Sequence, residues 1–122
     1  MRIVLFIYGT LKRGMKNHSR LAGQIFLHVA QTKPLYCLLD LGPYPGLIAD
    51  ENQGRAVVGE LWQVDESTLQ KLDSFEGVPT LFQRRAVQID SFSGEVQSYY
   101  YVGKKRGFDC GSSWPPQGDN TC

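Results

Sequence analysis

The sequence predicts an α+β domain built on a small mixed sheet that is strongly curved or closed, barrel-like, with short flanking helices. Short branched and aromatic runs recur along the chain at strand length, and Gly- and Pro-rich turns separate them. Only one segment has a clear helical pattern. A chain of 122 residues cannot cover a flat sheet of this size on both faces, so we expect curvature or closure.

Strand-like patterns occur in seven segments. These are residues 3–8, 24–32, 35–39, 46–49, 56–64, 82–89 and 96–102. The first is a continuous apolar run that ends at Tyr8, which is typical of a buried strand. Residues 41–46, with the sequence LGPYPG, are too rich in Pro and Gly for the interior of a sheet, so we expect a shaped loop there.

The clearest helix is predicted over Glu66–Phe75. Asp65 is a favourable N-cap, and Glu66 complements the positive end of the helix dipole. Gly77 and Pro79 are expected to end the helix.

A shorter helical turn is expected over Asn17–Ala22, with Asn17 as its N-cap and Gly23 as its stop. The length supports one hydrophobic core, so residues 1–122 are expected to form a single domain. Residues 107–122 are rich in Gly, Pro, Ser and Asn and predict an irregular C-terminal tail.

The composition indicates an ordinary globular protein. Hydrophobic residues make up 42% and charged residues 20%, with a net charge of +1. No apolar run approaches the roughly 20 residues needed to span a bilayer, and the N-terminus does not have the pattern of a secretory signal. Cys37, Cys110 and Cys122 are scattered without a CxxC pair, so we expect free thiols in a cytoplasmic protein, with no metal site and no membrane partner.

The most informative segment is Tyr8–Gly14, with the sequence YGTLKRG, directly after the first strand. Two glycines bracket a bend that can turn consecutive N–H groups toward one point, where they would bind an anion. Lys12, Arg13, Lys16 and Arg20 add positive potential. The alternatives are a plain β-turn and simple neutralisation of these charges by the acid-rich residues 40–76.

This loop also invites comparison with the phosphate-binding pattern GxxxxGK[ST]. Gly9 and Gly14 have the right spacing, but Met15 and Lys16 replace the required Lys and Ser/Thr. The hydroxyl that would hold magnesium is therefore missing, and we reject a nucleotide-binding function.

Glu76 is the strongest catalytic candidate. It falls at the C-terminal end of the predicted helix, where the dipole opposes a negative charge. Apolar neighbours, among them Phe75 and Val78, would desolvate it. Both effects raise the pKa of a carboxyl group and suit it to general acid and base work near neutrality. The alternative is that Glu76 is an ordinary surface glutamate at a helix end. Asp73 is the nearest other candidate for the catalytic carboxyl group, and we expect it to support the site and not to act itself.

Two further clusters are ambiguous. Arg84 and Arg85 face opposite sides of a strand, so one can pair with a carboxylate inside while both could equally be solvated. Tyr99 and Tyr101 share a face and are expected to fill the core or line a pocket. The segment Tyr99–Arg106 could instead stack on and bind nucleic acid, but the net charge makes that partner weak.

These motifs together resemble the γ-glutamylcyclotransferase-like family, and within it the γ-glutamylamine cyclotransferases. The similarity covers about residues 3–103. It is carried by YGTL at 8–11, KRG at 12–14, Asn17-His18, Tyr44-Pro45, LDSFEG at 72–77 and Arg84.

The resemblance implies a small β-barrel-like fold, no metal or organic cofactor, and conversion of γ-glutamylamine-type compounds to 5-oxoproline and a free amine. It implies that Glu76 is the general acid and base, and that the YGTL segment binds the γ-glutamyl group through backbone amides. The candidate substrate-binding residues are Tyr8, Gly9, Thr10, Leu11, Tyr44, Arg84 and Tyr101.

Two positions depart from the family pattern. Phe82 stands where many members have tyrosine, and the tail reads Cys110–Trp114 in place of a Gly-Asp-Trp-like element. A non-catalytic module that binds a γ-glutamyl or other small carboxylate ligand is therefore the alternative function. We expect a small-molecule partner and a monomer or weak dimer.

Overall fold

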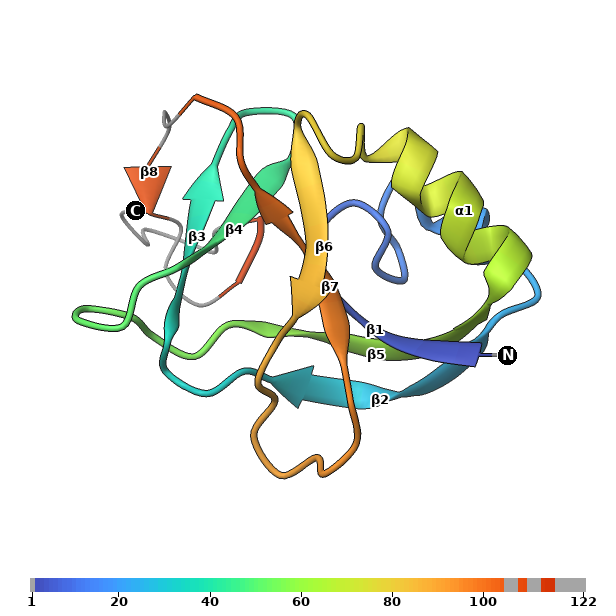
Figure 1. Cartoon of the computed structure of the whole chain (residues 1–122), viewed down its shortest axis with the longest axis horizontal. Coiled ribbons are helices and arrows are strands. Elements are labelled where there is room, and N and C mark those ends of the chain that lie inside the picture. Colours follow the sequence, from blue (N-terminus) through green and yellow to red (C-terminus); the bar gives the residue numbers. More distant parts are fainter. Residues whose placement is uncertain (1, 105–107, 110–112, 116–122) are drawn as a thin grey trace.

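The computed structural model describes residues 2–104, 108–109 and 113–115. Its strands are β1 (Arg2–Ile7), β2 (Ile25–Gln31), β3 (Tyr36–Asp40), β4 (Pro45–Ala49), β5 (Val58–Asp65), β6 (Phe82–Ala86), β7 (Gln97–Tyr101) and β8 (Phe108–Asp109). Its helices are the 3₁₀ turn η1 (His18–Leu21) and α1 (Glu66–Phe75). The predicted α+β class is confirmed (Figure 1).

All eight strands belong to one mixed sheet with the order β2-β5-β1-β7-β4-β3-β8, and β6 pairs with β7 beside this path. Most neighbours are antiparallel, whereas β7 runs parallel to both β1 and β4. The path ends at β2 and β8 and does not return on itself, so the sheet is curved but open. The closed form of the barrel prediction is therefore wrong.

The sheet divides at β7. Strand β6 pairs along the whole of β7, from Phe82 with Tyr101 to Ala86 with Gln97. The opposite edge of β7 is shared, because β1 pairs with it only at Leu5 and Gln97 and β4 only at Leu47 and Tyr100. Strands β1 and β4 therefore diverge where the chain leaves β1 for the loop at Tyr8.

Helix α1 begins and ends where its local sequence signals predict. The Asp65 carboxylate accepts a hydrogen bond of 2.8 Å from the Thr68 amide, which confirms the N-cap. Gly77 has a φ of 68°, a left-handed conformation that stops the helix at little steric cost to glycine. Leu69 and Leu72 are buried, and the helix contacts β1, β5 and η1.

The second predicted cap is wrong. Asn17 precedes η1 but makes no side-chain capping bond to it. Its side-chain amide instead donates to the Thr10 hydroxyl at 3.0 Å, because the loop after β1 folds back against this turn.

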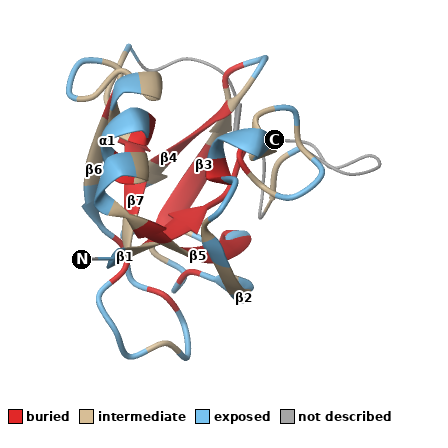
Figure 2. Cartoon of the chain, turned by 90° about the vertical axis from the view of Figure 1, so that its right-hand side faces the viewer, coloured by how far each residue is buried: buried red, intermediate tan, exposed pale blue. Residues whose placement is uncertain are grey.

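Two buried clusters lie on opposite faces of the sheet. Alternation along β1 sends Leu5 and Ile7 to the cluster beneath α1, and Phe6 to the other cluster. The same alternation places Tyr99 and Tyr101 together in the cluster beneath α1, as predicted. Figure 2 shows buried residues concentrated on the strands, with the outer side of α1 exposed.

The C-terminal prediction needs one correction. Strand β8 falls within the predicted irregular tail, where Phe108 pairs with Asp40 and Asp109 with Leu39. A two-residue strand held by distant β3 has no local sequence pattern of its own. Of the remaining tail, only residues 113–115 lie within the described part. Among all the described residues, from Arg2 onward, no helix is both long enough and apolar enough to cross a membrane.

Candidate active site

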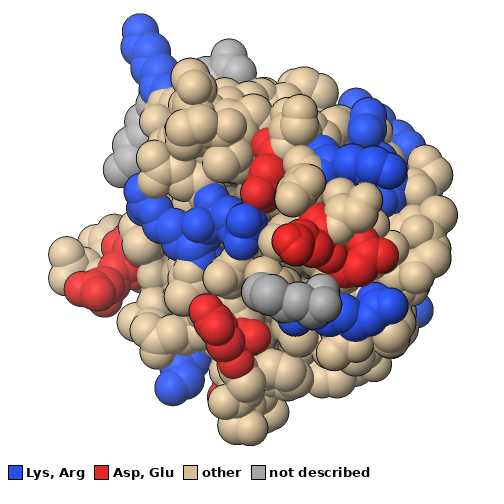
Figure 3. All heavy atoms as spheres, turned by 45° about the vertical axis from the view of Figure 1, so that its right-hand side comes forward, with Lys and Arg blue, Asp and Glu red and all other residues tan. Residues whose placement is uncertain are grey.

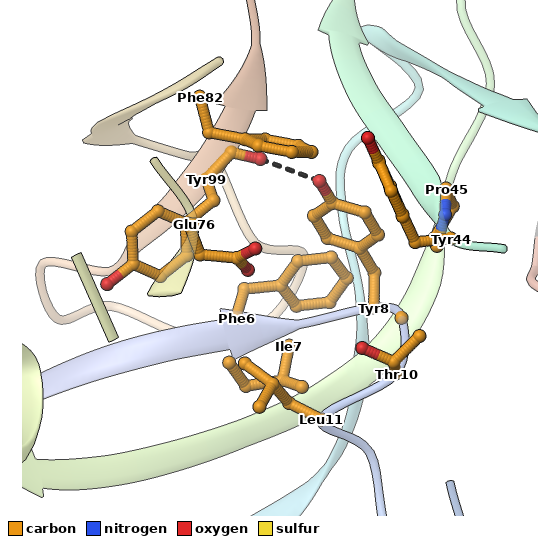
Figure 4. Close-up of a pocket in the computed structure, with 11 residues that line it drawn as sticks. Phe6, Ile7, Tyr8, Thr10, Leu11, Tyr44, Pro45, Glu76, Phe82 and Tyr99 are labelled. Atoms are coloured by element: carbon orange, nitrogen blue, oxygen red, sulfur yellow. Dashed lines mark hydrogen bonds between the residues drawn. The ribbon is translucent and has the colours of Figure 1, made fainter. Parts of the chain in front are cut away.

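A pocket opens where β1 and β4 diverge (Figure 4). The loop after β1, the start of β4, the end of α1, and strands β6 and β7 all contribute to its wall. The lining includes Tyr8, Gly9, Thr10, Leu11, Tyr44, Pro45, Glu76, Phe82 and Tyr99. The structure therefore brings six of the eight predicted site residues together: the four of YGTL, Tyr44 and the catalytic candidate Glu76.

The loop after β1 is a tightly organised backbone bend. The amides of Lys12, Met15 and Asn17 donate to the carbonyls of Gly9, Lys12 and Thr10 at 3.0–3.1 Å. The amides of Gly9, Thr10 and Leu11 donate no hydrogen bond within the described part of the chain. These consecutive unpaired donors belong to residues that line the pocket, which is the arrangement that an anion receptor requires.

Glu60, on β5, attaches this loop to the sheet. The residue is only 7% exposed, and its carboxylate accepts hydrogen bonds of 3.0–3.1 Å from the Trp62 indole and from the backbone and side chain of Arg13. Burial opposes the charge, but the hydrogen bonds from Trp62 and Arg13 outweigh it and lower the pKa of Glu60. Sequence analysis missed this residue, although an acid within the apolar stretch of β5 is a recognisable signal.

A close contact joins the loop to β4. A Cβ built on Gly9 would lie 2.8 Å from the Pro45 Cγ, closer than real atoms approach. Glycine is therefore required at position 9 by the proximity of the proline ring. This contact gives a physical reason for the pairing of the YGTL and Tyr44-Pro45 motifs.

Glu76 is the C-cap residue of α1, and its side chain points into the pocket toward Tyr8 (Figure 4). Burial raises the pKa of its carboxyl group to about 7, and the Arg20 cation opposes that rise. None of the described residues donates a hydrogen bond to this carboxyl group. Glu76 is therefore free to exchange a proton with a ligand near neutral pH.

Tyr8 is a structural bridge as well as part of the pocket wall. Its hydroxyl donates to the Tyr99 carbonyl at 2.7 Å and accepts from the Leu47 amide at 3.1 Å. These bonds join the end of β1 to the middle of β4 and of β7, where the sheet divides. Burial raises the pKa of this phenol well above its usual value, so it stays neutral.

Arg84 and Tyr101 are not among the residues that line the pocket. Arg84 forms a bidentate pair with Asp73, at 2.9 and 3.0 Å, and also bonds Gln97. Of the two alternatives that the sequence left open for the adjacent arginines, the structure shows the one in which an arginine pairs with a carboxylate. The Tyr101 hydroxyl donates to the Lys104 carbonyl at 2.6 Å, and its ring packs against Phe82.

Phe82 and the C-terminal segment also contribute to the site. Phe82 is 3% exposed and packs between the rings of Tyr44 and Tyr101, so the position that departs from the family pattern is an apolar part of the wall. Lys12 reaches Trp114 and donates to its carbonyl at 2.6 Å. The described part of the tail is therefore attached to the loop that carries the unpaired amides.

The charges on one face of the molecule are mixed. On the face shown in Figure 3, Lys and Arg side chains are interspersed with Asp and Glu and do not form one continuous basic field. Within the described residues, no group of three or more His, Cys, Asp and Glu side chains could hold a metal ion.

Comparison with known proteins places this chain in a family. The sequence profile described as "Gamma-glutamyl cyclotransferase, AIG2-like" matches residues 5–119. A candidate gamma-glutamylcyclotransferase of Vibrio cholerae is 42% identical over 88 residues, covering 72% of this chain and 74% of that protein. The gamma-glutamylaminecyclotransferase of Rattus norvegicus is 38% identical over 92 residues, covering 70% of this chain and 62% of its own length.

The fold similarity extends over nearly the whole chain. The crystal structure of an AIG2-like protein from Mus musculus superposes with a TM-score of 0.78 at 26% sequence identity. The match covers 96% of this chain and 98% of the mouse chain.

Proposed function

We propose that this chain, which belongs to the gamma-glutamyl cyclotransferase, AIG2-like family, converts γ-glutamylamine-type compounds to 5-oxoproline and a free amine. One observation carries the proposal. Loop amides without hydrogen-bond partners and a carboxyl group whose pKa is about 7 belong to residues that line the same pocket.

The loop after β1 would bind the substrate. The amides of Gly9, Thr10 and Leu11 offer hydrogen bonds to the α-carboxylate of a γ-glutamyl group, and amide dipoles at the same place stabilise negative charge on a reacting carbonyl oxygen. A γ-glutamyl chain held in a curled form has its α-amine next to its own γ-carbonyl. Proximity then accelerates an attack that is already intramolecular.

Glu76 would carry the protons. As a carboxylate it takes a proton from the α-ammonium, whose nitrogen then attacks the γ-carbonyl carbon and forms the lactam C–N bond. As a carboxylic acid it gives that proton to the nitrogen of the leaving amine while the amide C–N bond breaks. The lactam nitrogen loses one further proton and the released amine gains one from water, so the reaction neither consumes nor produces protons overall. A carboxyl group with a pKa of about 7 serves both steps.

The proposed reaction uses a small-molecule partner and asks for no cofactor, because one carboxyl group and a set of amides account for every step. We extend the proposal to a monomer or weak dimer that acts in the cytoplasm. A binding module without turnover is the less favoured alternative, since Glu76 has a pKa suited to proton transfer where simple binding requires none.

The test replaces Glu76 by Gln, which keeps the shape and removes the exchangeable proton. We expect the Glu76→Gln variant to fold normally and to release 5-oxoproline from a γ-glutamylamine at least about 100-fold more slowly, the usual contribution of general acid and base catalysis. Glu66→Gln, an exposed carboxyl group in the first turn of the same helix, is the matched control and should retain full activity. Undiminished product release from Glu76→Gln would contradict the assignment, and ligand binding by wild-type protein without product would favour the binding module.

A further inference from the structure

Two of the amides beside the pocket have a fixed direction, because the carbonyl groups of their own peptide units are occupied. A peptide unit is planar and trans, so its N–H and C=O groups point in opposite directions. The Gly9 carbonyl accepts from the Lys12 amide at 3.1 Å, and the Thr10 carbonyl accepts from the Asn17 amide at 3.0 Å. These two bonds turn the N–H groups of Thr10 and Leu11 away from the bonded side of the loop, and both residues line the pocket.

The next peptide unit of the loop is held by a histidine side chain. The Leu11 carbonyl lies 3.0 Å from the Nδ1 atom of His18, and because a carbonyl oxygen only accepts, this nitrogen carries the proton and is the donor. The same peptide unit supplies the Lys12 N–H that bonds the Gly9 carbonyl. His18 therefore fixes, through one peptide unit, the bond that orients the Thr10 amide.

His18 is itself attached to the sheet. Its ring packs edge-on against the Trp62 indole on β5, with 5.3 Å between the ring centres. The Trp62 indole donates to Glu60, whose carboxylate also accepts from the Arg13 amide. Strand β5 thus holds the loop at two points, at the Leu11 carbonyl through His18 and at the Arg13 amide through Glu60.

His18 does not belong to the pocket wall. It is half-buried, and it is not among the residues that line the pocket, although Thr10 and Leu11 are. Its effect on a ligand would therefore pass through the loop and not through direct contact.

On the basis of the proposed function, we infer that His18 is a positioning residue for substrate binding. It holds the Leu11 carbonyl so that the Thr10 and Leu11 amides are already directed at the α-carboxylate of a γ-glutamyl group. Without this bond the peptide unit between Leu11 and Lys12 is free to rotate, and the loop has to be ordered when the substrate binds. That ordering costs binding free energy and raises KM. Proton transfer at Glu76 does not use the bond, so kcat changes less.

Two substitutions separate the hydrogen bond of His18 from the packing of its ring. His18→Asn keeps an N–H donor attached to Cγ, near the place of Nδ1, and removes the ring. His18→Phe keeps a ring against Trp62 and removes the donor. We expect His18→Phe to raise KM for a γ-glutamylamine about five- to ten-fold, the effect of one lost hydrogen bond, with kcat within about two-fold of wild type. His18→Asn should keep both constants within about two-fold.

The order of stability should be the opposite. The ring contact with Trp62 stabilises the folded protein, so denaturant unfolding should show His18→Asn to be the less stable of the two variants. A purely structural role would instead give the less stable variant the higher KM. His28→Phe is the matched control, because His28 also bonds a backbone carbonyl through Nδ1 but is exposed on β2, away from the pocket wall, and its replacement should leave KM unchanged.

Binding of 5-oxoproline, measured by calorimetry, separates this inference from the proposed function. If wild-type protein binds 5-oxoproline but forms none from a γ-glutamylamine, the proposed reaction fails, and the role of His18 stands only if His18→Phe weakens this binding while His18→Asn keeps it. If wild-type protein neither binds 5-oxoproline nor forms it, both fail. If the substrate is turned over but His18→Phe keeps the wild-type KM, or His18→Asn raises KM as much as His18→Phe does, the reaction stands and the positioning role is refuted.

Discussion

At the scale of single residues, the site depends on a carboxyl group kept in an unfavourable environment. Glu76 in water would have a pKa near 4.5, whereas burial at the end of α1 raises it to about 7. The folded protein therefore binds a proton at Glu76 over a pH range in which the unfolded chain has lost it. Ionising Glu76 above that range opposes folding, so the raised pKa on which its proposed role in proton transfer rests also lowers the stability of the protein.

Because ionised Glu76 destabilises the folded protein, we predict that replacing it with a neutral residue increases stability by an amount that depends on pH. Between pH 4.5 and 7 the native state holds more protons than the unfolded state, so the contribution of Glu76 to the free energy of unfolding falls as pH rises. Above pH 7, where the effect is complete, a pKa shift of this size lowers the free energy of unfolding by about 3 kcal/mol. Glu76→Gln should therefore unfold at higher denaturant concentration than wild type at pH 8, with a much smaller difference at pH 4.5. A constant difference across this range would contradict the raised pKa.

At the scale of elements, an ion pair fixes the last turns of α1 against the sheet. Asp73 lies three residues before Glu76 and accepts two hydrogen bonds from Arg84 on β6 and one of 2.7 Å from the Tyr99 hydroxyl on β7. One carboxylate thus joins the helix to two strands. Arg84, expected to contact substrate, acts in the structure on the helix that carries Glu76.

We predict that Asp73→Asn weakens turnover through position and not through substrate contact. Arg84 would lose its partner charge, and because both side chains are about a quarter exposed, the loss of stability should be modest, about 1–2 kcal/mol. The kcat for a γ-glutamylamine should fall more than KM rises, since the pocket keeps its loop amides. Arg85→Gln, at the next and exposed position of β6, is the matched control and should change neither quantity. Equal effects of the two substitutions would rule out the positioning role.

Elements with local signals were predictable, and those that depend on distant partners were not. Helix α1 matches its predicted bounds of 66–75 because Asp65 and Gly77 mark its ends in the sequence. The sequence predicts that strand β6 continues to Ile89, but it ends at Ala86, opposite Gln97, where its antiparallel partner β7 begins. Ile89 forms only an isolated bridge with Thr32, so its apolar character reflects burial and not continued pairing with β7.

At the scale of the whole molecule, the site exists because the sheet divides. Strands β1 and β7 share one backbone pairing, and two side chains extend their contact: Ser98 donates to the Phe6 carbonyl at 2.7 Å, and Tyr8 donates to the Tyr99 carbonyl. The sequence predicted YGTL and Glu76 as parts of one site. It did not predict that the Tyr8 hydroxyl joins strands, since its partner in β7 lies 91 residues away.

Removing that hydroxyl should therefore weaken the whole sheet. In Tyr8→Phe, the Tyr99 carbonyl and the Leu47 amide both lose their partner in a buried position, and unsatisfied buried groups of this kind cost about 1–3 kcal/mol each at most. We expect denaturant unfolding to show a loss of this order. Tyr44→Phe removes a hydroxyl from the same pocket that makes no hydrogen bond within the described residues, so its stability should stay within about 0.5 kcal/mol of wild type. If the two variants are equally stable, the hydroxyl of Tyr8 does not hold β4 against β7, and its place in the pocket wall would be a matter of substrate contact alone.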